Sequence, residues 1–215
     1  MSVAMPIEKR PLPPNLPGFE HVRRYRDAAT GEAVVKLFPG DFYVTREDEI
    51  LDTVLGSCVA ACIRNVRTGV GGMNHFMLPK ARGTRLDSWS GPLGYATRYG
   101  AASMEQLINR ILGTGGTRAD LEVKIFGGAQ VLSGLSDIGT HNLNFVHEFL
   151  REEGLRISAE DVGDICPRQV RYQPRTGKVL MRRLGTTQSA QIASREERYL
   201  NGLEQAPSVG SIDLF

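Results

Sequence analysis

Two short apolar segments, joined by a turn, constrain the fold of this chain more than any other feature of the sequence. The segments are residues 58–65 and residues 70–78, and the second is closed by Pro79. Between them, the run Val-Arg-Thr-Gly at residues 66–69 is typical of a turn. The pattern predicts a β-hairpin, although the first segment also fits a short helix.

The hairpin would bring a thiol and an imidazole together. Cys58 begins the first segment and His75 lies in the second, and opposed Cβ atoms in a hairpin are about 4.5 to 5.5 Å apart. An imidazole that takes the thiol proton makes the sulfur a nucleophile. Gly56 allows a tight turn before the thiol, and the backbone N–H groups of Ser57 and Cys58 could hold an oxyanion. The residues alone leave a second interpretation open, in which Cys58 is a small core residue and His75 is structural.

The same residues resemble the CheD family, the chemoreceptor glutamine deamidases. The resemblance is carried by Leu-Gly-Ser-Cys-Val at residues 55–59 and by Gly-Gly-Met-Asn-His-Phe-Met-Leu-Pro at residues 71–79. It extends over residues 36–185, with further matching blocks at residues 124–129, 138–142 and 161–163.

The resemblance implies a catalytic set. Cys58 would be the nucleophile, His75 the proton carrier, and Thr53 the group that orients the imidazole. Gly56 and Ser57 would form the binding turn for the oxyanion. Asp52 is an alternative to Thr53, because a carboxylate orients an imidazolium more strongly.

The resemblance also implies an activity and its partners. The expected reaction is hydrolysis of glutamine side chains to glutamate and ammonia on the cytoplasmic helices of methyl-accepting chemotaxis receptors, which makes the protein a protein-glutamine glutaminase. The second interpretation is a non-catalytic partner that regulates a CheC-type phosphatase.

Composition excludes several other classes. The net charge is only +2, from 26 Lys and Arg against 24 Asp and Glu, which argues against a nucleic-acid partner. No apolar run approaches the ~20 residues that span a bilayer, so no membrane insertion is expected. Three cysteines do not form a disulfide framework and suit a reducing compartment, so a cytoplasmic location is predicted.

No metal and no cofactor are expected. A zinc site would have to combine Cys58, Cys62, His75 and His141, whose spacing lacks the second ligand pair of known zinc motifs. The sequence contains neither a Walker phosphate loop nor a dinucleotide fingerprint in a strand–helix context. Cys62 and Cys166 are therefore predicted to take no part in the chemistry.

Elsewhere in the chain, short strand-like segments outnumber helical ones. Helices are predicted at residues 100–112 and 142–153, and strands at residues 33–38, 42–45, 50–55, 121–126, 155–159, 169–172 and 178–184. Because the two kinds are interspersed without strict alternation, the class is α+β. The resemblance implies a layered sandwich of mixed β-sheets with flanking helices, similar to deamidating-toxin cysteine hydrolases.

Three parts of the chain are predicted. Residues 1–32 form a Pro-rich N-terminal extension, residues 33–185 the deamidase domain, and residues 186–215 a C-terminal extension with a helix at residues 191–203. Within the domain, the loop at residues 80–94 carries Trp89, which would contact either a partner or the core.

Overall fold

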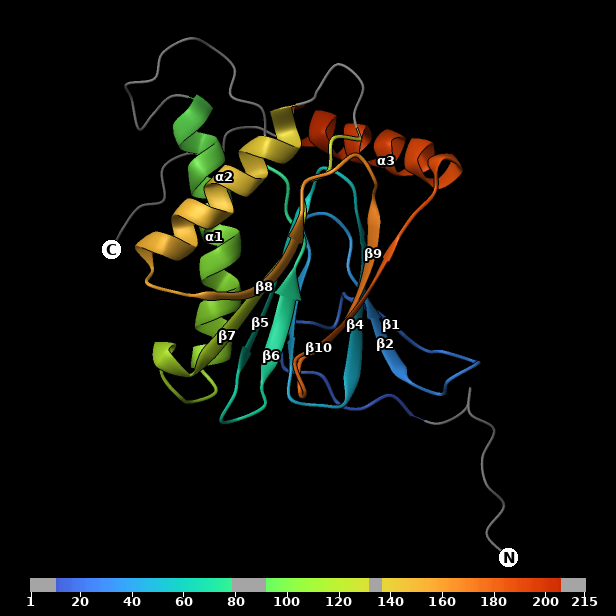
Figure 1. Cartoon of the computed structure of the whole chain (residues 1–215). Helices are drawn as coiled ribbons and strands as arrows, with labels where there is room; N and C mark the ends of the chain where they lie inside the picture. The colour runs from blue at the N-terminus through green and yellow to red at the C-terminus, as the bar shows by residue number, and fades with distance from the viewer. Residues whose placement is uncertain (1–10, 79–91, 132–136, 206–215) are drawn as a thin grey trace, which may run out of the picture.

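The described residues fold into two five-stranded β-sheets with three α-helices, and Figure 1 shows their arrangement in a computed structural model. The structure describes residues 11–78, 92–131 and 137–205. The first sheet has the order β1-β2-β4-β9-β10. Its strands are β1 (Arg23–Arg26), β2 (Ala33–Lys36), β4 (Glu49–Leu55), β9 (Arg168–Gln173) and β10 (Lys178–Arg183). Within it, β2 and β4 are parallel and the other neighbours are antiparallel.

The second sheet has the order β3-β6-β5-β7-β8. Its strands are β3 (Phe42–Thr45), β6 (Gly71–Asn74), β5 (Val59–Asn65), β7 (Leu121–Gly127) and β8 (Ile157–Val162). Only the β7–β8 pair is parallel. The α+β sandwich of mixed sheets predicted from the sequence is therefore confirmed.

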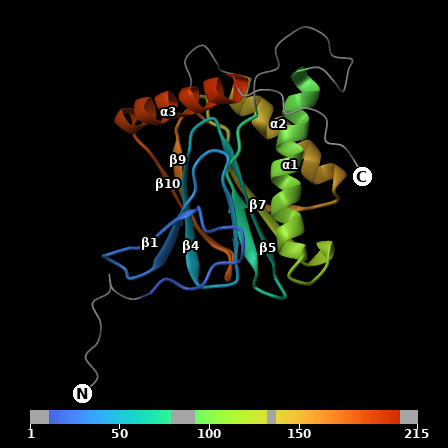
Figure 2. The ribbon, with the colours of Figure 1, turned by 180° about the vertical axis from the view of Figure 1, so that it is seen from behind.

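The helices cover one face and one end of this sandwich. Helices α1 (Pro92–Leu112) and α2 (Asp137–Glu152) contact strands of the second sheet. Figure 2 shows α1 running beside β5 and β7. Helix α3 (Thr186–Gln205) lies across one end of the sheets, at the top of Figure 1. A short 3-10 helix (Arg118–Asp120) precedes β7.

The predicted hairpin forms, and it lies at the centre of the core. Strands β5 and β6 pair antiparallel, with Cys62 opposite Met73, and an isolated bridge continues the pairing to Val59 and Phe76. Strand β5 lies between β6 and β7 and is buried almost throughout, which explains why its sequence is continuously apolar rather than alternating. The helical alternative for residues 58–65 is therefore wrong.

Most other elements lie where the sequence predicts them, with shifted ends. Helix α1 begins eight residues before the predicted start at residue 100, and α2 begins five residues before residue 142. Strand β8 begins two residues after the start predicted at residue 155 and ends three residues after the end predicted at residue 159. The predicted loop at residues 80–94, including Trp89, lies largely outside the described residues.

Strand β1 was not predicted, because its residues Arg23, Arg24, Tyr25 and Arg26 look like exposed chain. They form a charged edge strand, a common way to protect a sheet edge. Arg24 pairs with the buried Glu49 carboxylate at 2.5 Å. Just before this strand, Phe19 is buried against Phe42 and Tyr43, so part of the Pro-rich segment packs on the core.

Gly72 in β6 gives a first testable prediction about stability. A Cβ atom at this position would lie 2.2 Å from the Tyr43 carbonyl oxygen and 2.9 Å from Leu107 Cδ1. We expect Gly72→Ala to lower the free energy of unfolding by about 3 kcal/mol, since β3 and α1 would both have to move away from β6. Urea denaturation measures this loss. The matched control is Gly202→Ala on the exposed face of α3, where nothing lies within 4 Å and alanine should stabilise the helix slightly.

Candidate active site

The turn Gly56-Ser57-Cys58 joins β4 in the first sheet to β5 in the second, and hydrogen bonds hold it from several sides. Asn142 of α2 donates its side-chain N–H to the Ser57 carbonyl at 2.8 Å and accepts the Leu78 N–H at 2.8 Å. The Gly128 N–H donates to the Cys58 carbonyl at 2.7 Å. With their carbonyls fixed in this way, the residues of the turn direct their N–H groups to the opposite side.

His75 lies just after β6 and is oriented by Thr53 of β4. The Thr53 Oγ1 and His75 Nδ1 atoms are 2.8 Å apart, and both residues are buried. The Thr53 hydroxyl donates its only proton to the Leu37 carbonyl at 2.9 Å, so it accepts a hydrogen bond from the imidazole. His75 therefore carries its proton on Nδ1, which leaves the Nε2 lone pair free.

This Nε2 atom is buried and has no hydrogen-bond partner, while the Cys58 thiol lies close by. The ligand-type atoms of Cys58, His75 and Glu196 all lie within 4.8 Å of one another. Burial, with a smaller contribution from the Arg195 guanidinium, lowers the pKa of His75 to about 3. The imidazole is therefore neutral at physiological pH, the form that can accept a proton.

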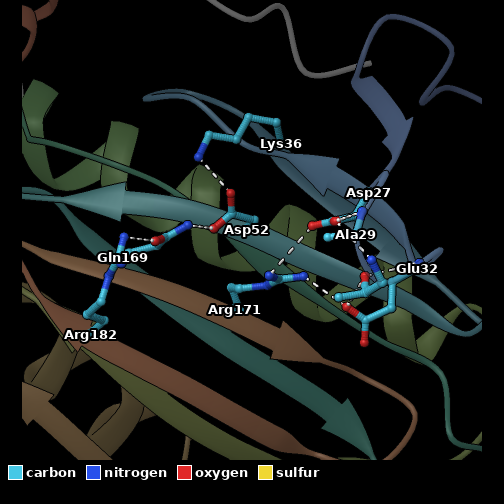
Figure 3. A network of polar contacts seen from close by, with 9 residues as sticks. Asp27, Ala29, Glu32, Lys36, Asp52, Gln169, Arg171 and Arg182 are labelled. Carbon is cyan, nitrogen blue, oxygen red and sulfur yellow. Dashed lines mark hydrogen bonds and ion pairs between the residues drawn. The ribbon is translucent and has the colours of Figure 1, made fainter.

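Asp52, the alternative orienting group, points away from His75. Its carboxylate pairs with Lys36 Nζ at 2.7 Å and accepts a hydrogen bond from the Gln169 side chain at 2.8 Å. Figure 3 shows Asp52 between these two partners, in a polar network that continues to Arg182. Because successive strand residues face opposite sides of a sheet, Thr53 alone of the pair faces the imidazole.

A carboxylate that sequence analysis did not identify lies in the same site. Glu196 of α3 is fully buried, and its Oε1 accepts hydrogen bonds from the N–H groups of Gly56 at 2.8 Å and Cys58 at 3.4 Å. Its Oε2 accepts from both the N–H and the hydroxyl of Ser57, each at 2.8 Å. The N–H groups predicted to hold an oxyanion therefore face the Glu196 carboxylate.

Glu196 also acts on the thiol. Burial raises the pKa of Cys58 well above its usual range, and the charge of the Glu196 carboxylate, with a hydrogen bond to it, raises this pKa further. An active nucleophilic cysteine needs the opposite shift. In this arrangement the thiol is protonated.

Known proteins resemble the chain over nearly its whole length. A protein of Halorhodospira halophila named probable chemoreceptor glutamine deamidase CheD is 49% identical over 205 residues, which are 95% of this chain and 94% of the relative. Proteins with the same name from Hahella chejuensis and Methylobacillus flagellatus are 44% and 43% identical over 97% and 99% of this chain, and 98% and 100% of their own. The family model for CheD chemotactic sensory transduction matches residues 77–183. The chain belongs to the CheD family.

The residues matched by the CheD family model include neither the turn at Cys58 nor His75. Among them is Asn142, which holds the turn and which sequence analysis noted only as part of a matching block. The available signal in the sequence was an asparagine on the otherwise apolar face of this helix. Glu196 lies beyond the matched residues, and its pairing with the turn spans about 140 positions of the chain, so no local signal points to it.

The remaining candidate residues of this CheD chain lie elsewhere. Asn74 accepts a hydrogen bond from the Ala61 N–H at 2.8 Å and contacts α1, a structural position as predicted. Cys62 is buried on β5, Cys166 is partly exposed, and His141 is exposed on α2. The imagined zinc set of Cys58, Cys62, His75 and His141 does not assemble.

In the part of the chain that the structure describes, one group could hold a metal ion, namely Cys58, His75 and Glu196. Both carboxylate oxygens of Glu196 already accept hydrogen bonds from the turn, which leaves them poorly placed as ligands. Among the described helices of this CheD chain, none has the length and apolar character needed to cross a bilayer.

Proposed function

We propose that this chain is a chemoreceptor glutamine deamidase in which Cys58 is the nucleophile and His75 carries the proton. The observation that carries the proposal is the orientation of His75 by Thr53, which leaves Nε2 free beside a thiol at a turn rich in N–H donors. The names of the relatives, all probable chemoreceptor glutamine deamidases, support the substrate.

The first half of the reaction forms a thioester. His75 Nε2 takes the Cys58 proton, and the sulfur attacks the side-chain carbonyl carbon of the substrate glutamine. The negative charge that develops on the carbonyl oxygen is stabilised by the N–H groups of the turn, with Ser57 and Gly56 next to the thiol. The C–N bond then breaks, and His75 gives its proton to the departing nitrogen, which leaves as ammonia.

The second half releases glutamate. Water attacks the thioester carbon while His75 Nε2, again neutral, takes one of its protons. The C–S bond breaks, His75 returns its proton to the thiolate, and the carboxylic acid loses its remaining proton to solvent and leaves as a carboxylate. No step calls for a cofactor. Thr53 takes part throughout by keeping the imidazole in the tautomer that presents Nε2.

The test uses purified protein and the cytoplasmic fragment of a methyl-accepting chemotaxis receptor. We expect release of ammonia in an enzyme-coupled assay, in proportion to the glutamines converted. Free glutamine and an unrelated helical protein rich in glutamine serve as controls. No ammonia from any receptor fragment would refute the activity. This function also places the protein in the cytoplasm with the receptor domains, and binding of a CheC-type phosphatase stays a prediction.

Thr53 allows a graded test of the imidazole's orientation. The variant Thr53→Val keeps the shape of the side chain but removes the hydroxyl that fixes the tautomer. We expect kcat to fall about tenfold to a hundredfold, part of the 10²–10⁴-fold that a general base contributes. The variant Thr53→Ser should restore most of the rate, because it keeps the hydroxyl. Equal loss in both variants would mean that packing of the threonine methyl group, and not the hydrogen bond, is what matters.

A further inference from the structure

Helix α3 presents one face to the end of the sandwich that carries the candidate site. The residues of this face recur at helical spacing and are buried or partly buried: Ile192, Ala193, Glu196, Tyr199, Leu200 and Leu203. Leu200 belongs to the hydrophobic core. Glu197 and Arg198, on the opposite face, are exposed. The helix is thus an amphipathic element, and its buried acid Glu196 points at the catalytic turn.

The Glu196 side chain carries the same chemical group as the product of the proposed reaction. A carboxylate has two acceptor oxygens, and both are filled by donors of the turn, three backbone N–H groups and the Ser57 hydroxyl. A neutral glutamine amide would set its own NH₂ group against some of these donors. The group in the site is therefore a glutamate carboxylate carried by a helix, and hydrolysis of a glutamine on a receptor helix produces the same group.

Contacts on either side of Glu196 hold the helix close to the sheets. The Arg195 guanidinium donates to the Val54 carbonyl at 3.3 Å, and the Tyr199 hydroxyl bonds to that of Tyr99 in α1 at 2.7 Å. A Cβ atom added at Gly56 would lie 2.7 Å from a carboxylate oxygen of Glu196. With α3 in place, the Cys58 and His75 side chains are inaccessible to solvent and to any substrate.

We propose that α3 is a built-in competitor of the substrate, which occupies the docking surface of the receptor helix and places Glu196 where the product glutamate lies. This inference rests on the proposed function, since it identifies the occupant by the product of that reaction. The raised pKa of Cys58 is consistent with it, because the carboxylate that adds to the effect of burial belongs to α3. Activity then requires α3 to leave the site, and a receptor helix and α3 exclude one another.

The first test measures access to Cys58 without any receptor. Full-length protein is treated with iodoacetamide, and alkylation of the peptide that contains Cys58 is followed by mass spectrometry. We expect Glu196→Ala to speed this alkylation at least tenfold. Leu200→Ala, which weakens the apolar packing of α3 on the core but leaves the turn intact, should also speed it. The control Glu197→Ala, on the exposed face of the same helix, should react like the unchanged protein.

The second test measures competition. If α3 covers the site in most molecules, the apparent affinity for the receptor falls by the fraction that is open. Glu196→Ala should therefore lower KM for the receptor fragment several-fold with little change in kcat. A synthetic peptide of residues 186–205 should slow Cys58 alkylation in the Glu196→Ala protein, and the same peptide with Glu196→Ala should not.

The outcomes separate this inference from the proposed function. Faster alkylation in the Glu196→Ala and Leu200→Ala proteins, without ammonia release from any receptor, would support α3 as a cover and refute the deamidase. Ammonia release with the same alkylation rate and the same KM in all these variants would support the deamidase and overturn the role of α3.

Discussion

Replacing Cys58 with alanine is expected to reduce ammonia release from a receptor fragment at least about a thousandfold, since without the sulfur no thioester can form. Alanine fits the space of the thiol in this buried position, so the fold should be retained. The measurement is the initial rate of ammonia release, with far-ultraviolet circular dichroism to show that the variant is folded.

Cys166→Ala is the matched control for this variant. Cys166 is a free, partly exposed cysteine far along the chain, in the loop between β8 and β9. The rate of Cys166→Ala should equal that of the unchanged protein. A Cys58→Ala protein that retains its rate would mean that the reaction does not pass through a covalent intermediate at this sulfur.

Replacing Arg168 with alanine is expected to cost about 3 to 5 kcal/mol of the free energy of unfolding. Arg168 is the first residue of β9, and its side chain is completely buried. It pairs with the Asp161 carboxylate at 2.6 Å and donates to the backbone carbonyls of Asp161 and Gly163. Without the guanidinium, these partly buried acceptors at the end of β8 lose their donor, and the Asp161 carboxylate keeps only the longer contact with Arg183 at 3.5 Å.

Urea denaturation of Arg168→Ala and Arg182→Ala tests this directly. Arg182 lies on the neighbouring strand β10 and is exposed, with one hydrogen bond to the Gln169 side chain at 3.0 Å. Its replacement should change stability by less than about 0.5 kcal/mol, as is usual for surface positions. If the two variants unfold at the same urea concentration, the buried guanidinium does not hold the β8–β9 connection.

The hairpin and its two chemical groups could be predicted because the signals are local. Cys58 lies just before β5 and His75 just after β6, two strands joined by one short turn, and the apolar runs around them have the length of strands. The pairing of Thr53 with His75 was predicted through family resemblance; geometry alone could not separate it from Asp52. Only the strand direction in space shows that Asp52 faces Lys36 and Gln169.

What sequence analysis missed depends on contacts between distant parts of the chain. A helix was predicted at residues 191–203, within α3, but nothing in residues 186–205 indicates what its inner face covers. In the sequence, Glu196 looks like any surface glutamate on such a helix. Its burial and its partners follow from where the helix docks, and this docking is set by apolar residues such as Leu200. Strand β1 was missed for a related reason, since its Arg24 is paired with the Glu49 carboxylate of another strand.

The most direct test of the account is peptide-level mass spectrometry of a receptor cytoplasmic fragment incubated with the unchanged protein or with Cys58→Ala. The account predicts that particular glutamines of the receptor helices become glutamates with the unchanged protein, and that the same residues stay glutamines with the variant. Receptor glutamines left unchanged by both proteins, or converted equally by both, would contradict it.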